Sequence, residues 1–165
     1  MISMNIPVGV SDFVEIRRNG YYYIDKTALI AELLKTTGTK VTLITRPRRF
    51  GKTLGMSMLE NFFDIRKNSE EMFQGLEIAK NKELCNAWMN KYPVIFLSLK
   101  NVEGLDFPSA YQQLVYEIGI LYQEHEYLLE SAEISEPDKR LFQQLRDRQA
   151  GQTDVMRSIQ FWLAC

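Results

Sequence analysis

The feature that most constrains this chain is the stretch TRPRRFGKTL, residues 45–54, which follows the apolar run VTLI. It contains Gly51-Lys52-Thr53, and a helical pattern of apolar residues begins directly after it. The order of apolar strand, tight loop and amphipathic helix is typical of a phosphate-binding loop, whose general pattern is G-x-x-x-x-G-K-[ST]. The first glycine of that pattern would fall on Arg46. The chain therefore matches one half of the motif and departs from the other.

Each residue of the triplet suits phosphate chemistry. Backbone N–H groups at the start of a helix attract anions, and Gly51 lets a phosphate approach without a Cβ in the way. Lys52 is expected to place its ammonium group against the β- and γ-phosphates, and the Thr53 hydroxyl to bind Mg²⁺. Pro47 stiffens the entry to the loop, whereas Arg46 would carry strain of about 1 kcal/mol if it adopted the positive φ that glycine supplies.

The alternative is an ordinary basic turn in front of a helix. In that case Arg46, Arg48 and Arg49 are solvated or paired with acidic neighbours. A Gly-Lys-Thr triplet is weak evidence by itself, and the strand and helix around it strengthen the case for a nucleotide site. Two hypotheses follow from the residues. One is a loop that binds a nucleoside triphosphate, and the other is a non-catalytic protein-interaction module with a structural or anion-binding basic loop.

Hydrophobic periodicity predicts an α/β fold around this loop. Two short apolar runs, KVTLIT at residues 40–45 and PVIFLSL at 93–99, predict buried strands of a parallel sheet. After the loop, Leu54, Met58 and Phe62 recur every four residues, as on the buried face of a helix. Further helices are predicted over residues 69–76, 81–92, 109–132 and 138–149, with a last one beginning near Thr153.

Composition and charge narrow the classes of partner. Twenty basic and twenty-one acidic residues give a net charge of -1, so no overall field attracts nucleic acid or an anionic membrane. Arg17-Arg18 and the pair Arg146 and Arg148 have acidic neighbours and are expected to be solvated, which supports nucleic acid only weakly. His125 lies between two glutamates and is expected at the surface. No apolar run approaches the roughly 20 residues of a membrane span, and the two cysteines lack zinc-site spacing, so we expect a cytoplasmic protein.

The sequence also indicates that the chain is part of a longer domain. Two strands and many helices make an incomplete sheet, and the sequence ends on the apolar residues Phe161 to Ala164. We therefore expect residues 1–165 to be the N-terminal part of a single domain, truncated before the rest of its sheet. Exposed strand edges predict some self-association.

Four stretches resemble a known family, the AAA-ATPase-like domain of bacterial P-loop proteins, which is often followed by a nuclease-like domain of the PD-(D/E)XK type. They are FVEIRRNGYYYIDKTALIAELL (13–34), TRPRRFGKTLGMSML (45–59), MFQGLEI (72–78) and YPVIFLSLK (92–100). In that family the loop is similar to R-P-R-R-F-G-K-[ST], so Arg46 matches the family where it departs from the general motif.

The resemblance implies a P-loop NTPase-like fold with ATP and Mg²⁺ as cofactors, Thr53 on the metal, and a variant Walker A loop. The residues that it implies for nucleotide binding are Arg48, Arg49, Phe50, Gly51, Lys52, Thr53 and Leu54. Such ATPases also need an acidic strand, the Walker B strand, which this sequence lacks. No catalytic residue is therefore assigned, and hydrolysis by this chain is expected to be poor. In the shared run YYYIDKT, one reading places Asp25 or Lys26 at the nucleotide or a neighbouring subunit, but a helix-capping role for Asp25 is favoured.

Overall fold

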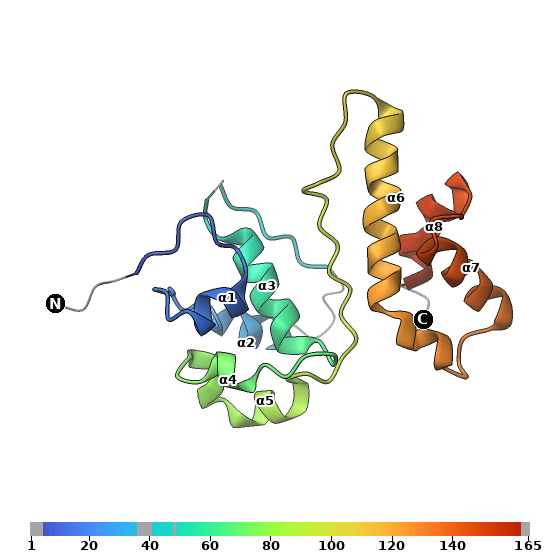
Figure 1. The fold of residues 1–165 in the computed structure, drawn as a ribbon. Coiled ribbons are helices and arrows are strands. Elements are labelled where there is room, and N and C mark those ends of the chain that lie inside the picture. The colour runs from blue at the N-terminus through green and yellow to red at the C-terminus, as the bar shows by residue number, and fades with distance from the viewer. Residues whose placement is uncertain (1–4, 36–40, 48, 163–165) are drawn as a thin grey trace. The chain divides into compact units, whose positions relative to one another are not determined.

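The computed structural model describes residues 5–35, 41–47 and 49–162 of the chain (Figure 1). The chain divides into two compact units, Met1–Val94 and Ile95–Cys165, each with its own hydrophobic core. The two units are described separately below, and the predicted phosphate-binding loop belongs to the first.

In its described part, the first unit is built of short helices. They are, in chain order, α1 (Phe13–Arg18), α2 (Ala28–Lys35), α3 (Lys52–Phe63), α4 (Glu70–Phe73), the 3-10 helix η1 (Glu77–Lys80) and α5 (Lys82–Trp88). Local capping explains where two of them begin. Asp12 accepts a hydrogen bond from the Glu15 N–H at the start of α1, and Asn81 accepts one from the Leu84 N–H at the start of α5.

Helix α3, which follows the loop, supplies much of the core of the first unit. The predicted helical face is confirmed, because Met58 and Phe62 are fully buried and Leu54 packs against the same cluster. The Phe62 ring meets that of Phe73 edge-on at 5.4 Å, and the Phe73 ring lies 4.8 Å from that of Phe13 in α1. Burial of each such side chain stabilises the fold by about 1.5–3 kcal/mol.

The C-terminal end of α3 is held by Asn90. This residue adopts the left-handed conformation, with φ of 53°. Its amide group donates to the carbonyls of Asn61 and Asp64 at 3.1 and 2.9 Å and accepts from the Ser69 N–H at 3.1 Å. Its backbone N–H donates to the Phe62 carbonyl at 2.7 Å. One side chain thus satisfies carbonyl groups that the end of a helix leaves without partners.

An ion pair lies beside this contact. The Asp64 side chain is fully buried and is bound by the Arg66 guanidinium, with a shortest distance of 2.6 Å. Burial raises the pKa of Asp64, but hydrogen bonds and charge from Arg66 outweigh it, and the net pKa is below the usual value for aspartate. Asp64 also forms a parallel β-bridge with Tyr92. The segment after α5 is therefore fastened to the end of α3.

The described part of the second unit is a set of packed helices: α6 (Phe107–Glu124), the 3-10 helix η2 (Glu126–Glu130), α7 (Glu136–Arg146) and α8 (Gln152–Trp162). Helices α6 and α7 each pack against α8 and against one another. The ring of Tyr122 packs on that of Phe142, and the Tyr122 hydroxyl donates to the Ser158 carbonyl at 3.1 Å. The predicted helices of this region are confirmed, except that the long one ends at Glu124 rather than at 132. The sequence ends on the apolar residues Phe161 to Ala164, and the side chains of these residues are not among those that the structure describes.

The surface position predicted for His125 is wrong. The helix ends just before this residue, and the imidazole turns inward, where it is fully buried. Its Nδ1 lies 2.9 Å from the Leu121 carbonyl. The flanking glutamates suggested an exposed helical face, but His125 follows the buried Ile118, Leu121 and Tyr122 at helical spacing and therefore lies on the buried face.

The predicted α/β fold, a P-loop NTPase-like parallel sheet, is also wrong for the residues that the structure describes, which are helical and contain no sheet. Residues 41–47 and 93–99 are not in regular secondary structure. The side chains of Val41 and Leu43 are 82% and 84% exposed, so this apolar run is not buried. Strand propensity becomes a strand only where a neighbour pairs the backbone groups, and the structure supplies no such ladder here. The self-association inferred from strand edges stays a prediction.

Substitutions at Asn90 test the contact that ends α3. Asn90→Gly keeps the left-handed backbone but removes the amide, so we expect a loss of about 1–3 kcal/mol in the free energy of unfolding. Asn90→Ala removes the amide and adds left-handed strain, so it should cost about 1 kcal/mol more. Urea unfolding at neutral pH measures both. Equal stability of wild type and Asn90→Gly would show that the amide contributes nothing.

Candidate phosphate-binding loop

The loop enters α3 through two residues in the left-handed conformation. Arg49 has φ of 67° and Gly51, the N-cap of α3, has φ of 75°, whereas Phe50 between them has no positive φ. Alternation of this kind turns successive N–H groups toward one side of the backbone, as in anion-binding nests. Arg46 is not among the residues with positive φ, so the strain considered there falls on Arg49 instead.

The ammonium group of Lys52 closes the loop on itself. Its Nζ donates to the carbonyl of Arg46 at 2.6 Å and to the carbonyl of Pro47 at 3.0 Å. Residues at the entry to the loop are thus joined to the first residue of α3. An ammonium group has three N–H donors, so two carbonyls leave one donor for another acceptor.

The N-terminal end of α3 is left open. No side chain of the described residues caps it, and the first helical hydrogen bond runs from the Gly55 N–H to the Gly51 carbonyl at 2.8 Å. The first four N–H groups of an α-helix have no partner within the helix. Thr53 is exposed in this first turn, while the Leu54 side chain faces the core and leaves only its backbone at the loop. Arg48 lies outside the described residues.

A lysine from a distant part of the sequence reaches the same loop. Lys26 Nζ donates to the Phe50 carbonyl at 3.2 Å, and a Cβ built on Gly51 would lie 3.5 Å from that nitrogen. The sequence analysis favoured a capping role for Asp25 and did not predict a contact between Lys26 and the loop. The shared run YYYIDKT was the signal, but spacing could not show which loop Lys26 would meet.

The residues on either side of Lys26 are fixed by hydrogen bonds. Asp25 accepts from the N–H and hydroxyl of Thr27 at 2.8 and 2.7 Å and from the Glu77 N–H at 2.7 Å. Thr27 is fully buried, and its hydroxyl accepts from the Ile78 N–H at 3.1 Å. Burial raises the pKa of Asp25, but these hydrogen bonds from Thr27 and Glu77 bring the net pKa below its usual value. These bonds close a turn before α2 and join that turn to η1, so the predicted helix-capping role of Asp25 stays a prediction.

The arginines considered for nucleic acid make contacts within the protein. Arg17 donates to the carbonyls of Met72 and Gln74, at 2.7 and 2.8 Å. Arg146 pairs with Glu126 and Asp147, and the Arg148 guanidinium lies over the Tyr116 ring at 4.4 Å from its centre. These side chains are engaged rather than simply solvated. Nucleic-acid binding is not shown.

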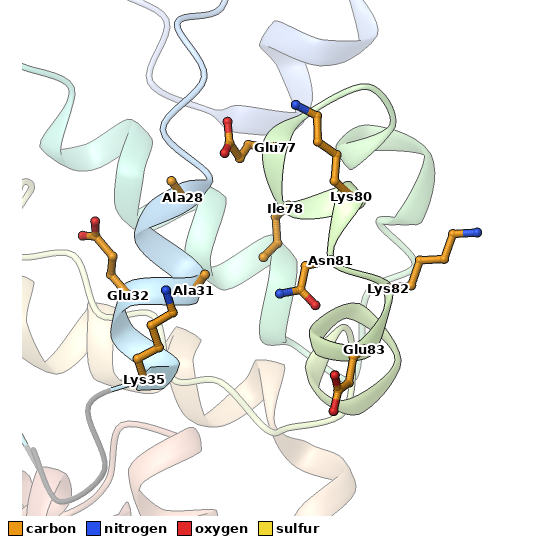
Figure 2. Close-up of a pocket in the computed structure, with 10 residues that line it drawn as sticks. All are labelled: Ala28, Ala31, Glu32, Lys35, Glu77, Ile78, Lys80, Asn81, Lys82 and Glu83. Atoms are coloured by element: carbon orange, nitrogen blue, oxygen red, sulfur yellow. The ribbon is translucent and has the colours of Figure 1, made fainter.

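A hollow of about 560 Å³ lies elsewhere on the first unit, between α2, η1 and α5 (Figure 2). It contains no residue of the predicted loop. Acidic and basic side chains alternate around it, so it has no single charge to attract an anion. Its lining residues are Ala28, Ala31, Glu32, Lys35, Glu77, Ile78, Lys80, Asn81, Lys82 and Glu83.

The described residues also bear on metal binding and on membranes. No group of three or more histidine, cysteine, aspartate or glutamate side chains there is placed to hold a metal ion. Within the same residues, every helix is too short or too polar to cross a bilayer.

Comparison with known proteins identifies the family. The family model described as Predicted AAA-ATPase matches residues 7–156, and the chain therefore belongs to the AAA-ATPase-like family. The chain is 34% identical over 99 residues to a protein from Azotobacter chroococcum mcd 1, described as an uncharacterized protein in the vnfD 5′ region. The match covers 59% of this chain and 17% of that relative. No solved structure matches the chain. The family resemblance is confirmed, while the downstream nuclease-like domain stays a prediction.

Two glycines of the loop and helix give a matched test of the backbone geometry. Gly51→Ala should destabilise the protein by about 1 kcal/mol, because an L-residue is strained at its positive φ. Gly55 lies inside α3 with open space beside it, so Gly55→Ala should stabilise by up to about 1 kcal/mol through helix propensity. Urea unfolding compares the two variants. Stabilisation by Gly51→Ala would contradict the left-handed entry to α3.

Proposed function

We propose that residues 46–54 bind the phosphate chain of ATP as a variant Walker A loop. Membership of a family described as Predicted AAA-ATPase supports nucleotide binding at the level of the family. The observation that carries the proposal for this chain is the Lys52 ammonium group, held on the carbonyls of Arg46 and Pro47 at the open end of α3. This arrangement places a cation and unpartnered helical N–H groups at one point of the chain.

The proposed contacts follow from what each group has to offer. Gly51 lets phosphate approach closely, and the N–H groups of Arg49, Phe50 and Lys52 to Leu54 donate to its oxygens. The Lys52 ammonium keeps a donor for the terminal phosphates while its other bonds hold the loop. Arg48 and Arg49 add positive charge. When Mg²⁺ is bound it neutralises phosphate charge, and the exposed Thr53 hydroxyl is the ligand that this chain offers it.

The proposal for this chain is restricted to binding. The relative from Azotobacter is much longer than the matched region, which covers only 17% of its length. We propose that in the complete protein nucleotide binding is coupled to a further effector domain. The second hypothesis, an interaction module with a structural or anion-binding loop, draws on the exposed apolar side chains of Val41 and Leu43.

Replacing Lys52 tests the proposed phosphate contact. Lys52→Ala should weaken ATP binding by about 10- to 100-fold, because charge-assisted hydrogen bonds are worth about 1.5–3 kcal/mol. Isothermal titration calorimetry with and without Mg²⁺ measures the effect. Lys91→Ala is the control, since Lys91 is also exposed but lies next to Tyr92, at the other end of α3. Equal ATP affinity in wild type and Lys52→Ala would favour the interaction module.

The Thr53 hydroxyl is tested by its dependence on Mg²⁺. Thr53→Val keeps the shape of the side chain but removes the oxygen, so the gain in ATP affinity from Mg²⁺ should fall by about tenfold. Affinity without Mg²⁺ should change little. Thr53→Ser retains the hydroxyl and should retain the gain. A similar response to Mg²⁺ in wild type and Thr53→Val would remove Thr53 as a metal ligand.

A further inference from the structure

The backbone around Lys26 is held in place by contacts that do not involve the loop. The neighbours of Lys26 are tied to η1, because Asp25 accepts from the Glu77 N–H and Thr27 accepts from the Ile78 N–H. Thr27 is fully buried, so the backbone at Lys26 is anchored. Its side chain is exposed and extends to the Phe50 carbonyl. The lysine therefore approaches the loop from a separate and rigid part of the fold.

Its position is close to the point where phosphate would approach. Phe50 immediately precedes Gly51, and Lys26 Nζ is 3.5 Å from a Cβ built on that glycine. Among the described residues a single carbonyl accepts from Lys26, at 3.2 Å, which leaves two of the three ammonium donors for other acceptors. The Lys26 ammonium group thus lies beside Gly51, the left-handed residue just before α3.

The two lysines at the loop, Lys26 and Lys52, have no ion-pair partner among the described residues. Both ammonium groups bind only backbone carbonyls, and Arg49 adds a third cation to the same turn. Like charges in one place repel, so lysines that lack an ion-pair partner there favour an anionic ligand.

We propose that Lys26 is a second phosphate-binding lysine, which contacts the phosphate chain of the bound nucleotide together with Lys52. The proposal rests on the proposed function of the loop and extends it to a residue 24 positions before Phe50. Lys52 reaches the phosphates from α3, and Lys26 reaches them from the segment just before α2. The hydrogen bond from Lys26 to the Phe50 carbonyl holds the ammonium group at the loop before the ligand binds.

Charge removal at Lys26 tests this contact through the number of phosphates in the ligand. Lys26→Met keeps the apolar stem and should weaken ATP binding by about tenfold, ADP by less, and AMP little. Calorimetric titration at two salt concentrations should show a weaker salt dependence for ATP in the variant. Lys26→Arg, which keeps the charge, should recover most of the affinity. Lys80→Met is the control, because Lys80 is an exposed lysine in η1 that lines the separate hollow.

The outcomes separate this inference from the function on which it rests. If wild type binds ATP and Lys52→Ala weakens it, equal affinity in Lys26→Met and Lys80→Met would overturn the inference alone. Equal weakening of ATP, ADP and AMP would assign Lys26 a structural role and also overturn it. A wild-type chain that binds no ATP would overturn both proposals.

A measurement on the wild-type chain avoids the risk that a variant misfolds. An amine-reactive acetylating reagent, with peptide mass spectrometry as the readout, reports the reactivity of each lysine. Saturating ATP should slow the modification of Lys26 and Lys52 several-fold and leave Lys80 unchanged. Unchanged modification of Lys26 at an ATP concentration that protects Lys52 would count against the contact.

Discussion

Burial of one face of α3 is the constraint on which the first unit depends. Met58 and Phe62 are removed from water, and through Phe73 and Phe13 the same cluster holds α1 and α4. A helix anchored along one side cannot rotate without exposing that cluster. The position of its first residue, Lys52, is therefore set by packing further along the helix. Packing of the core thus determines where the loop lies.

The two ends of α3 are treated in different ways. At the C-terminal end, Asn90 occupies the helix carbonyls with its amide and holds the following segment in place. At the N-terminal end, no side chain caps the helix, and the hydrogen bonds of the loop run from two lysines to backbone carbonyls. The side-chain hydrogen bonds that stabilise the helix are thus at its C-terminal end. The other end keeps donors and positive charge at the surface, as binding of an anion requires.

Sequence patterns predicted those features that are determined locally. The helical face of Met58 and Phe62 followed from spacing, because a helix with a buried stripe has a period of 3.6 residues. The strands at 40–45 and 93–99 failed, because a strand also depends on a partner that no local pattern can guarantee. Lys26 was weighed as a contact to the nucleotide and not favoured, since its bond to Phe50 spans 24 positions of sequence that spacing cannot bridge. The left-handed conformations of Arg49 and Gly51 were not predicted, because the sequence analysis considered a positive φ only at Arg46.

The contact made by Asn90 has a consequence for the order in which the first unit can assemble. Its amide joins residue 90 to Asn61 and Asp64, which precede it by 29 and 26 positions. During synthesis the ribosome releases α3 well before Asn90 emerges, so the nascent helix lacks this cap while α4 and α5 are being made. Completion of α3 is thus delayed until the last residues of the unit are available, and loop closure over this span limits how early it can occur.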